Sequence, residues 1–312
     1  MGYNLAVTWF FLALVAPFLY AVTNHIDKAL ISKYFKEGGV GTLILFSSLL
    51  SAIAIPVILF FEPNVLTSDL SSILLLSLVG ILDIAILWCY LVALEGDEPS
   101  IIIVFYQLVP VFALLFGFIL LGESLSYMQL IAMAIVMFGT TLVSVELDEN
   151  NRFKLRRKTV IYMTLAAAAW AAESVLFKYV ALEENVWRSL FWEHLMLAFV
   201  GLLIFILVKK YRLHFLKALK ENSGAILGLN VTNEVLYMVG NITVAFAVML
   251  APVALVLLAE PMQAFFVFII GLFLSFFFPG IHKEKITAFS LVQKVSALTI
   301  TTIGTYILLS VT

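Results

Sequence analysis

The chain has 312 residues, of which 63% are hydrophobic and 12% are charged, and its formal net charge is −2. This is too little polar surface to cover a water-soluble globule, so the composition predicts an integral membrane protein that contacts the lipid bilayer. No basic stripe interleaves with aromatic residues, which excludes a nucleic-acid partner. Cys89 is the single cysteine, which excludes an internal disulfide and a cysteine-based metal site.

Long apolar segments run through the whole chain. A span needs about 20 mostly apolar residues, and inside lipid the backbone must satisfy its own hydrogen bonds, so these segments predict helices. The N-terminal segment has no cationic region and no small-residue cleavage pattern, so it is predicted to stay as a membrane helix. The predicted spans are 7–31, 40–61, 71–94, 99–121, 127–146, 159–182, 188–208, 223–249, 252–278 and 287–310.

The last five predicted spans echo the first five. Tyr20 stands 150 residues before Trp170, and the neighbouring polar residues of the first and sixth spans pair at the same shift. Because five is an odd number, the two copies must cross the membrane in opposite senses, as in many secondary transporters. The sequence therefore predicts an all-α membrane protein of ten transmembrane helices, built as two inverted five-helix repeats over residues 1–150 and 151–312.

The basic residues of the predicted loops lie almost entirely on one side. The odd-numbered loops carry fourteen Lys and Arg residues, whereas the even-numbered loops and both tails carry only Arg188. Because Lys- and Arg-rich loops stay in the cytoplasm, both termini are predicted to lie outside, in a prokaryotic cytoplasmic membrane. The fourteen are Lys33, Lys36, Arg152, Lys154, Arg156, Arg157, Lys158, Lys209, Lys210, Arg212, Lys217, Lys220, Lys283 and Lys285.

Polar residues recur at helical spacing inside the spans. They are costly in lipid and should face a cavity or a partner helix. In the eighth span such residues run from Asn230 to Asn241 at i, i+3, i+4, i+7 and i+11, which is one helical face. We predict an acidic, amide-rich and aromatic chamber for a small molecule, formed by Tyr20, Thr23, Asn24, Asp83, Tyr90, Gln107, Trp170, Glu173, Asn230, Asn233, Glu234, Tyr237, Glu260 and Gln263.

Some of these residues have a second interpretation. Single amides such as Asn241 and Gln263 serve equally well as hydrogen-bonding links between helices. Deep burial disfavours the charged form of a carboxyl group, so at least one of Glu173, Glu234 and Glu260 is predicted to exchange protons.

Three further charged residues lie within or near the ends of the spans. Lys294 is predicted either to neutralise an acid on a neighbouring helix or to bind an anionic group of the substrate. Asp27 and Lys178 lie near predicted helix ends, where reaching toward the membrane surface is the expected explanation. No metal and no cofactor are predicted.

A run of motifs in the first half resembles a known family. The run from Leu108 to Leu125 contains Pro110, an aromatic stripe and Leu-Gly-Glu ending at Glu123, and Gly139 follows in the next span. It resembles the fourth and fifth helices of an EamA-type repeat of the drug/metabolite transporter superfamily. The resemblance implies a ten-helix bundle with a central cavity and transport of a small metabolite or drug.

The resemblance has two departures. In the second repeat, residues 276–284 stand where Leu-Gly-Glu would be. Several ten-helix relatives are also usually drawn with both termini inside, opposite to the orientation that the loop charges predict.

These features predict a secondary transporter, proton-driven or facilitative, that exports or exchanges a cationic, zwitterionic or amide-bearing metabolite, such as an amino-acid-like solute, by alternating access. A carrier of phosphorylated or nucleotide-linked metabolites is the alternative, although it would need several Arg or Lys in its cavity. The spans hold no motif of an intramembrane enzyme and no repeated ring of a channel. We expect the protein to act as a monomer.

Overall fold

The computed structural model of the chain describes residues 2–35, 39–96, 102, 104–144, 157–221, 223–277 and 288–311. These residues are almost all helical, and none of them belongs to a strand. The described residues leave out most of the polar link between the predicted repeats. They also leave out most of residues 276–284, where the second repeat departs from the Leu-Gly-Glu motif. The same holds for Lys36, Arg152, Lys154, Arg156, Lys283 and Lys285.

Every predicted span corresponds to helix in the structure. Seven of them contain one long helix: α1 (Gly2–Ala29), α4 (Leu70–Gly96), α7 (Tyr127–Ser144), α8 (Arg157–Ala181), α9 (Val186–Leu207), α11 (Ser223–Leu250) and α14 (Ala288–Ser310). The remaining three spans are interrupted or begin with tighter turns.

The second span is broken in its middle. It consists of α2 (Gly39–Leu50), the short 3-10 turn η2 (Ser51–Ile53) and α3 (Ala54–Phe61). Pro56 explains the break, because proline lacks a backbone N–H and its ring crowds the carbonyl group four residues earlier, at Ala52.

Proline also accompanies the irregular turns of the fourth and ninth spans. Pro110 lies in the first turn of α6, and Pro261 lies within η5. A proline is tolerated at a helix start but not in a helix interior. Both of these spans therefore begin with shorter helical elements. These elements are η4 (Val104–Gln107), α6 (Leu108–Leu121), α12 (Val253–Leu257), η5 (Glu260–Met262) and α13 (Gln263–Phe277).

The connection between the seventh and eighth spans contains a helix that the sequence did not predict. This helix, α10 (Lys209–Lys220), packs against α2 and α9. Its Phe215 ring lies 4.6 Å from the ring of Phe46, between centroids, and its Tyr211 ring fills the space beside Gly41. Aromatic residues one turn apart therefore face the bundle, which makes α10 an amphipathic helix at one end of the molecule.

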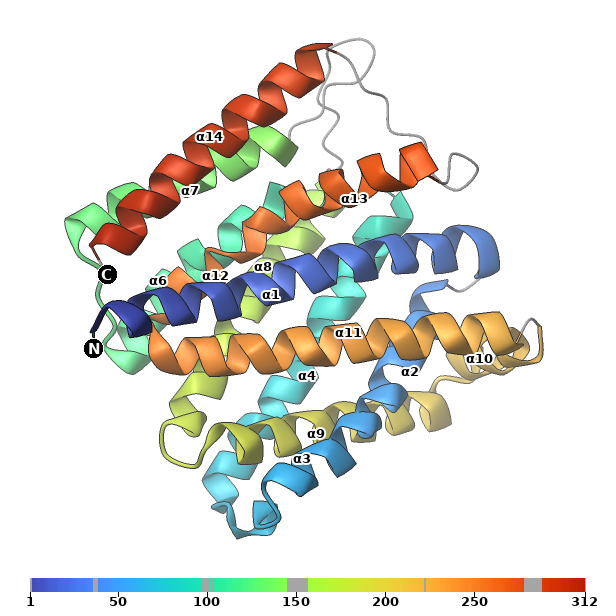
Figure 1. Cartoon of the computed structure of the whole chain (residues 1–312). Coiled ribbons are helices and arrows are strands. Elements are labelled where there is room, and N and C mark those ends of the chain that lie inside the picture. Colours follow the sequence, from blue (N-terminus) through green and yellow to red (C-terminus); the bar gives the residue numbers. More distant parts are fainter. Residues whose placement is uncertain are drawn as a thin grey trace.

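Nine helical segments of the described chain are long and apolar enough to cross a membrane. The fifth predicted span differs, because its apolar part, Tyr127–Leu142, is shorter than the others. This helix, α7, packs along α14 at the edge of the bundle (Figure 1). A Cβ atom on Gly139 would clash with Thr301, so a small residue allows the two helices to approach closely.

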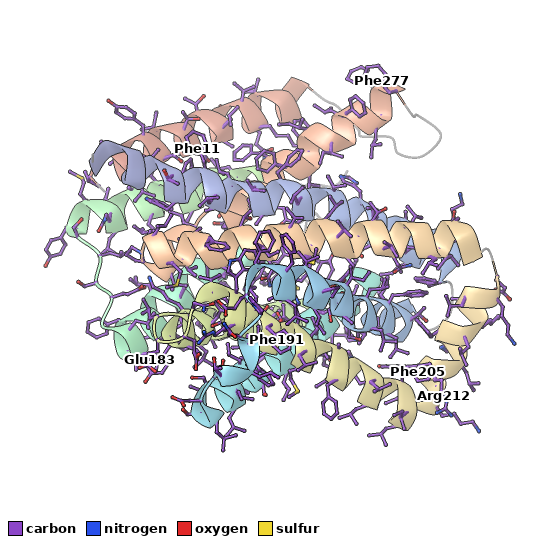
Figure 2. The ribbon with its side chains drawn as sticks, turned by 60° about the horizontal axis from the view of Figure 1, so that its bottom comes forward. Phe11, Glu183, Phe191, Phe205, Arg212 and Phe277 are labelled. Atoms are coloured by element: carbon purple, nitrogen blue, oxygen red, sulfur yellow. The ribbon has the colours of Figure 1, made fainter. Side chains whose placement is uncertain are left out.

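The outer surface is suited to lipid. Figure 2 shows Phe11 and Phe277 at the periphery of the bundle, and these side chains are 63% and 67% exposed. Figure 1 shows both termini at one end of the bundle, whereas α10 with its five basic residues lies at the opposite end. We call these the terminal end and the α10 end.

Candidate functional site

A polar cavity, here called the chamber, lies between α1, α4, α8 and α11. The volume of this cavity is about 120 Å³. One water needs about 10–15 Å³ by this measure, so the chamber has room for a small organic solute or several waters. The predicted residues that line it are Tyr20, Thr23, Asn24, Asp83, Tyr90, Trp170, Asn230, Asn233, Glu234, Tyr237 and Gln263.

The chamber occupies the part of the bundle toward the α10 end. Its wall comes from the C-terminal half of α1, from Tyr20 onward, and from the N-terminal halves of α8 and α11, up to Trp170 and Tyr237. In Figure 1 the named halves of α1 and α11 run toward the end where α10 lies.

Asp27 belongs to the chamber wall, contrary to the prediction that it reaches toward the membrane surface. Its side chain is buried, and its Oδ1 accepts a hydrogen bond of 2.8 Å from Nδ2 of Asn233. The predicted span ended at residue 31, whereas the helical segment runs on to Tyr34. The chain continues beyond Asp27 as a π-helix, η1 (Leu30–Tyr34), so Asp27 lies deeper than a helix end.

Hydrogen bonds hold the other polar groups of the wall. The Tyr90 hydroxyl donates to Oδ1 of Asn24 at 2.9 Å. The Ser47 hydroxyl donates to Oε2 of Glu234 at 2.6 Å. These bonds connect α1 with α4 and α2 with α11, so they orient the wall as well as joining the helices.

Several buried polar atoms of the chamber have no hydrogen-bond partner in the described structure. One of them is a donor, Nδ2 of Asn24. The others are acceptors: Oδ2 of Asp83, Oδ1 of Asn233, Oε1 of Glu234 and Oε1 of Gln263. Buried polar groups are nearly always paired, so these atoms require water or a solute. Because acceptors outnumber donors, the complementary solute is one that donates hydrogen bonds.

A layer of aromatic rings closes the chamber toward the terminal end. The rings of Tyr20 and Tyr237 stack with 5.4 Å between centroids, and Trp170 lies 6.4 Å from Tyr20. Gly240 makes room for this layer, because a Cβ atom there would lie 2.6 Å from Cε1 of Tyr20. We call Tyr20, Trp170 and Tyr237 the aromatic layer.

A second, smaller pocket lies on the other side of the aromatic layer. The volume of this pocket is about 30 Å³. The three rings of the aromatic layer line both the pocket and the chamber. The polar lining of the pocket comes from Glu173, Ser174, Glu193 and Asn241. Glu173 is therefore beside this pocket rather than in the chamber.

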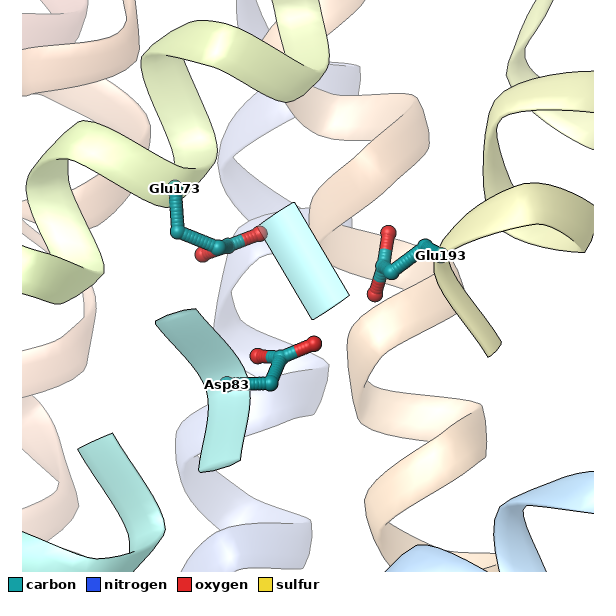
Figure 3. A group of neighbouring side chains, drawn as sticks. All are labelled: Asp83, Glu173 and Glu193. Carbon is teal, nitrogen blue, oxygen red and sulfur yellow. The ribbon is translucent and has the colours of Figure 1, made fainter. Parts of the chain in front are cut away.

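Three carboxylates from three helices meet between the chamber, which Asp83 lines, and this pocket, which Glu173 and Glu193 line. Asp83 of α4, Glu173 of α8 and Glu193 of α9 each place one oxygen within 4.8 Å of the other two (Figure 3). The sequence analysis missed Glu193, because it belongs to no polar stripe of its span. The available signal was its occurrence as an acid inside an apolar segment.

Gln107 and Glu260 line neither space, although both were predicted to do so. Gln107 exchanges hydrogen bonds with the hydroxyl group of Thr140 in α7, at 2.7 and 3.0 Å. It therefore links two helices, which was the second interpretation for such amides. Glu260 is 1% exposed, and its Oε2 has no hydrogen-bond partner among the described residues.

Lys294 is also separate from the chamber. Its Nζ lies 3.5 Å from the centroid of the Phe268 ring, so α14 contacts α13 through a cation–π interaction. The ammonium group of Lys294 therefore packs against the ring of Phe268, outside the chamber.

An ion pair closes the terminal end beyond the small pocket. Nζ of Lys178 lies 2.6 Å from Oε1 of Glu123 and donates to the carbonyl group of Ala251 at 2.9 Å. Oε2 of Glu123 accepts the N–H of Val253 at 2.9 Å. Lys178 was predicted to reach toward the membrane surface, but it is buried against α6. The left-handed residue Gly122, with φ of 66°, ends α6 and turns Glu123 back toward this contact.

Comparison with known proteins identifies the family. Residues 7–145 match the model of the EamA-like transporter family. The first half of the chain therefore contains an EamA-like repeat. This confirms the resemblance seen around Pro110 and Glu123, and it makes the chain a multi-pass membrane protein of a transporter family.

Two further comparisons used curated protein sequences and solved structures. No curated protein sequence matches the chain. Among solved structures 28 chains match, and one crystal structure has a TM-score of 0.62 at 15% identity, covering 97% of this chain and 95% of that chain. At this identity the similarity extends to the fold alone.

Proposed function

We propose that the protein is a secondary transporter that exports or exchanges a small cationic, zwitterionic or amide-bearing metabolite. The observation that carries this proposal is the excess of unpartnered acceptors in the chamber, in a wall that also holds Asp27 and Glu234. An ammonium group offers three donors and no acceptor, so it complements such a wall better than an anion does.

The aromatic layer supports the same solute class. A cation within about 6 Å of an aromatic ring centre is attracted by the ring, most strongly by tryptophan. Tyr20, Trp170 and Tyr237 form one boundary of the chamber, and all three lie on the polar stripes of their helices. A solute with an ammonium group can therefore contact carboxylates on one side and rings on the other.

A carrier of phosphorylated metabolites fits less well. Phosphate is bound in proteins by arginine and lysine side chains and by backbone N–H groups. Neither Lys nor Arg occurs among the described residues that line the chamber, whereas Asp27, Asp83 and Glu234 do. Phosphate in this cavity would therefore meet three acids without a compensating basic residue.

The proposed mechanism is alternating access between two inverted five-helix repeats, 1–150 and 151–312. The chamber lies toward the α10 end, and the aromatic layer and the Glu123–Lys178 pair close the terminal end. We assign the α10 end to the cytoplasm from its basic residues, with both termini outside, and the transporter to a monomer in the cytoplasmic membrane. The structure then corresponds to an inward-facing state.

Flux into proteoliposomes tests this function. Amines, amino acids and sugar phosphates are screened with purified protein, with and without a pH gradient. We expect saturable flux of an amine or amino acid and none of a sugar phosphate. Empty liposomes are the control, and Glu183→Gln serves as the surface-acid control variant. Flux of sugar phosphates without flux of amines would establish the alternative substrate class instead.

A further inference from the structure

We infer that Asp83, Glu173 and Glu193 form a binding site for a hard metal cation of the size of sodium or calcium. The three residues are called the acid triad below. The inference goes beyond the proposed function, because it concerns an ion rather than the transported solute and is testable with no solute present.

The geometry of the acid triad suits a single ion. One oxygen from each carboxylate lies within 4.8 Å of the other two, and Figure 3 shows the three groups converging. Calcium–oxygen distances are about 2.3–2.6 Å, so two oxygens on one ion lie at most about 5 Å apart. Because α4 packs along both α8 and α9, the backbone holds the three carboxylates in place.

Free ligand atoms remain on the acid triad. Oδ2 of Asp83 and Oε2 of Glu193 have no hydrogen-bond partner, although these residues are only 7% and 1% exposed. Asn241 donates to Oε1 of Glu193 at 2.9 Å, and Ser174 donates to Oε2 of Glu173 at 3.0 Å. The Asn241 donor thus holds one oxygen of Glu193 and leaves its second oxygen, Oε2, without a partner. Buried acceptors of this kind require a ligand.

The charge of the acid triad has no partner within the described protein. None of the ion pairs among the described residues includes Asp83, Glu173 or Glu193. A buried charge without compensation is strongly unfavourable, so the acid triad takes up either protons or a metal cation from solution. Carboxylate oxygens are the preferred ligands of hard cations such as calcium.

The small pocket supplies the rest of the coordination shell. Its 30 Å³ corresponds to about two water positions, at 10–15 Å³ each. Calcium takes about six to eight oxygen ligands, which three carboxylates, some of them bidentate, and bound waters can provide. The pocket thus has room for the waters of a hydrated metal ion.

The position of the acid triad connects the ion with the chamber. Asp83 lines the chamber, whereas Glu173 and Glu193 line the small pocket beyond the aromatic layer. An ion held by all three residues therefore changes the charge that a solute meets at Asp83. This step, unlike ion binding itself, rests on the proposed function.

The test measures ion binding to purified protein in detergent, at fixed pH and without solute. Thermal unfolding is followed against sodium, calcium and magnesium chloride, with choline chloride as the ionic-strength control. We expect saturable stabilisation by sodium or calcium, with an apparent affinity at least tenfold weaker in Asp83→Asn and Glu193→Gln. Glu260→Gln is the matched control, since it neutralises a buried acid outside the triad, and it should retain the wild-type affinity.

A second measurement covers the case in which the triad variants do not fold. Terbium(III) replaces calcium in oxygen sites, and its emission is sensitised by a nearby tryptophan. Wild-type protein should show sensitised emission that calcium or sodium displaces, and Trp170→Phe should reduce it, because Trp170 lines the same pocket as Glu173.

Three outcomes would overturn the inference. One is stabilisation by choline equal to that by the metals, and another is unchanged ion affinity in the triad variants. The third is stabilisation by low pH alone, without displaceable terbium emission, which would mean that protons are the only cations bound. None of these results affects the proposed solute transport, and absence of solute flux would leave ion binding intact.

Discussion

Lys178 and Glu123 form a buried ion pair with 2.6 Å between Nζ and Oε1, and this pair joins the end of α6 to the last turn of α8. The same two side chains bond to the backbone of Ala251 and Val253. Glu123 is the acid of the Leu-Gly-Glu motif in the first half of the chain, and its two partners here, Lys178 and Val253, belong to the second half. The motif thus holds the two halves together at the terminal end.

Removing one partner of this pair should destabilise the protein. Lys178→Met leaves Glu123 in a site where its side chain is 15% exposed, and breaking a buried pair in this way costs about 3–5 kcal/mol. The double variant Lys178→Met with Glu123→Gln should recover part of the loss, because no unpaired charge remains. Thermal unfolding of the wild type, both single variants and the double variant measures the coupling. Strictly additive effects would show that the pair contributes nothing to the closure of the terminal end.

The acids of the chamber should determine which solutes bind. Asp27→Asn and Glu234→Gln keep the shape of the wall but remove its charge. We expect the apparent affinity for a cationic solute to fall by about tenfold or more, since a hydrogen bond to a charged group contributes about 1.5–3 kcal/mol. Uncharged amide solutes should be affected less. Concentration-dependent flux measures both, with the exposed acid variant Glu183→Gln as control, and equal losses for charged and uncharged solutes would argue against charge recognition.

The aromatic layer should contribute to affinity through its rings. Trp170→Ala and Tyr237→Ala remove a ring, and a cation–π contact is worth about 0.5–2 kcal/mol. Apparent affinity should therefore weaken by between twofold and thirtyfold at about 1.4 kcal/mol per tenfold change. Tyr237→Phe keeps the ring and should retain most of the affinity. Flux with unchanged affinity in both alanine variants would mean that these rings serve only helix packing.

Proton coupling should depend on Glu173 and not on Glu260, although the sequence predicted the same role for both acids. Glu173 lines the small pocket, whereas Glu260 lines neither space. We expect Glu173→Gln to abolish flux driven by a pH gradient while downhill exchange continues, and Glu260→Gln to retain both. The two activities are compared in the same proteoliposomes. Loss of gradient-driven flux in Glu260→Gln alone would place the proton pathway outside the two cavities.

Helical periodicity was sufficient to predict most of the chamber. In α11, Asn230, Glu234 and Tyr237 fall on one face at i, i+4 and i+7, and in the structure that face lines the cavity. The prediction succeeds because, in a regular helix, the separation of two residues in the sequence determines whether their side chains share a face. The long uninterrupted helices were predicted from the length of their apolar segments.

Residues whose role depends on tertiary contacts were not predictable. Glu193 is the single acid of its predicted span, and its position beside Asp83 and Glu173 arises from the packing of α9 on α4. Lys178 pairs with none of the acids near it in the sequence, and its partner lies 55 residues away. Asp27 was misjudged because the π-helix that follows α1 extends the helical segment, and one sequence gives no sign of such an extension.

The most direct test of the proposal asks whether solute occupies the chamber and from which side the chamber is open. Ser47 lines the chamber beside Glu234, so Ser47→Cys, in a Cys89→Ala background, places one thiol in the wall. We predict that an impermeant thiol reagent modifies it in inside-out vesicles and not in right-side-out vesicles, and that the transported amine or amino acid slows the reaction. Modification from the terminal end, or a rate that no transported solute changes, would contradict the proposal.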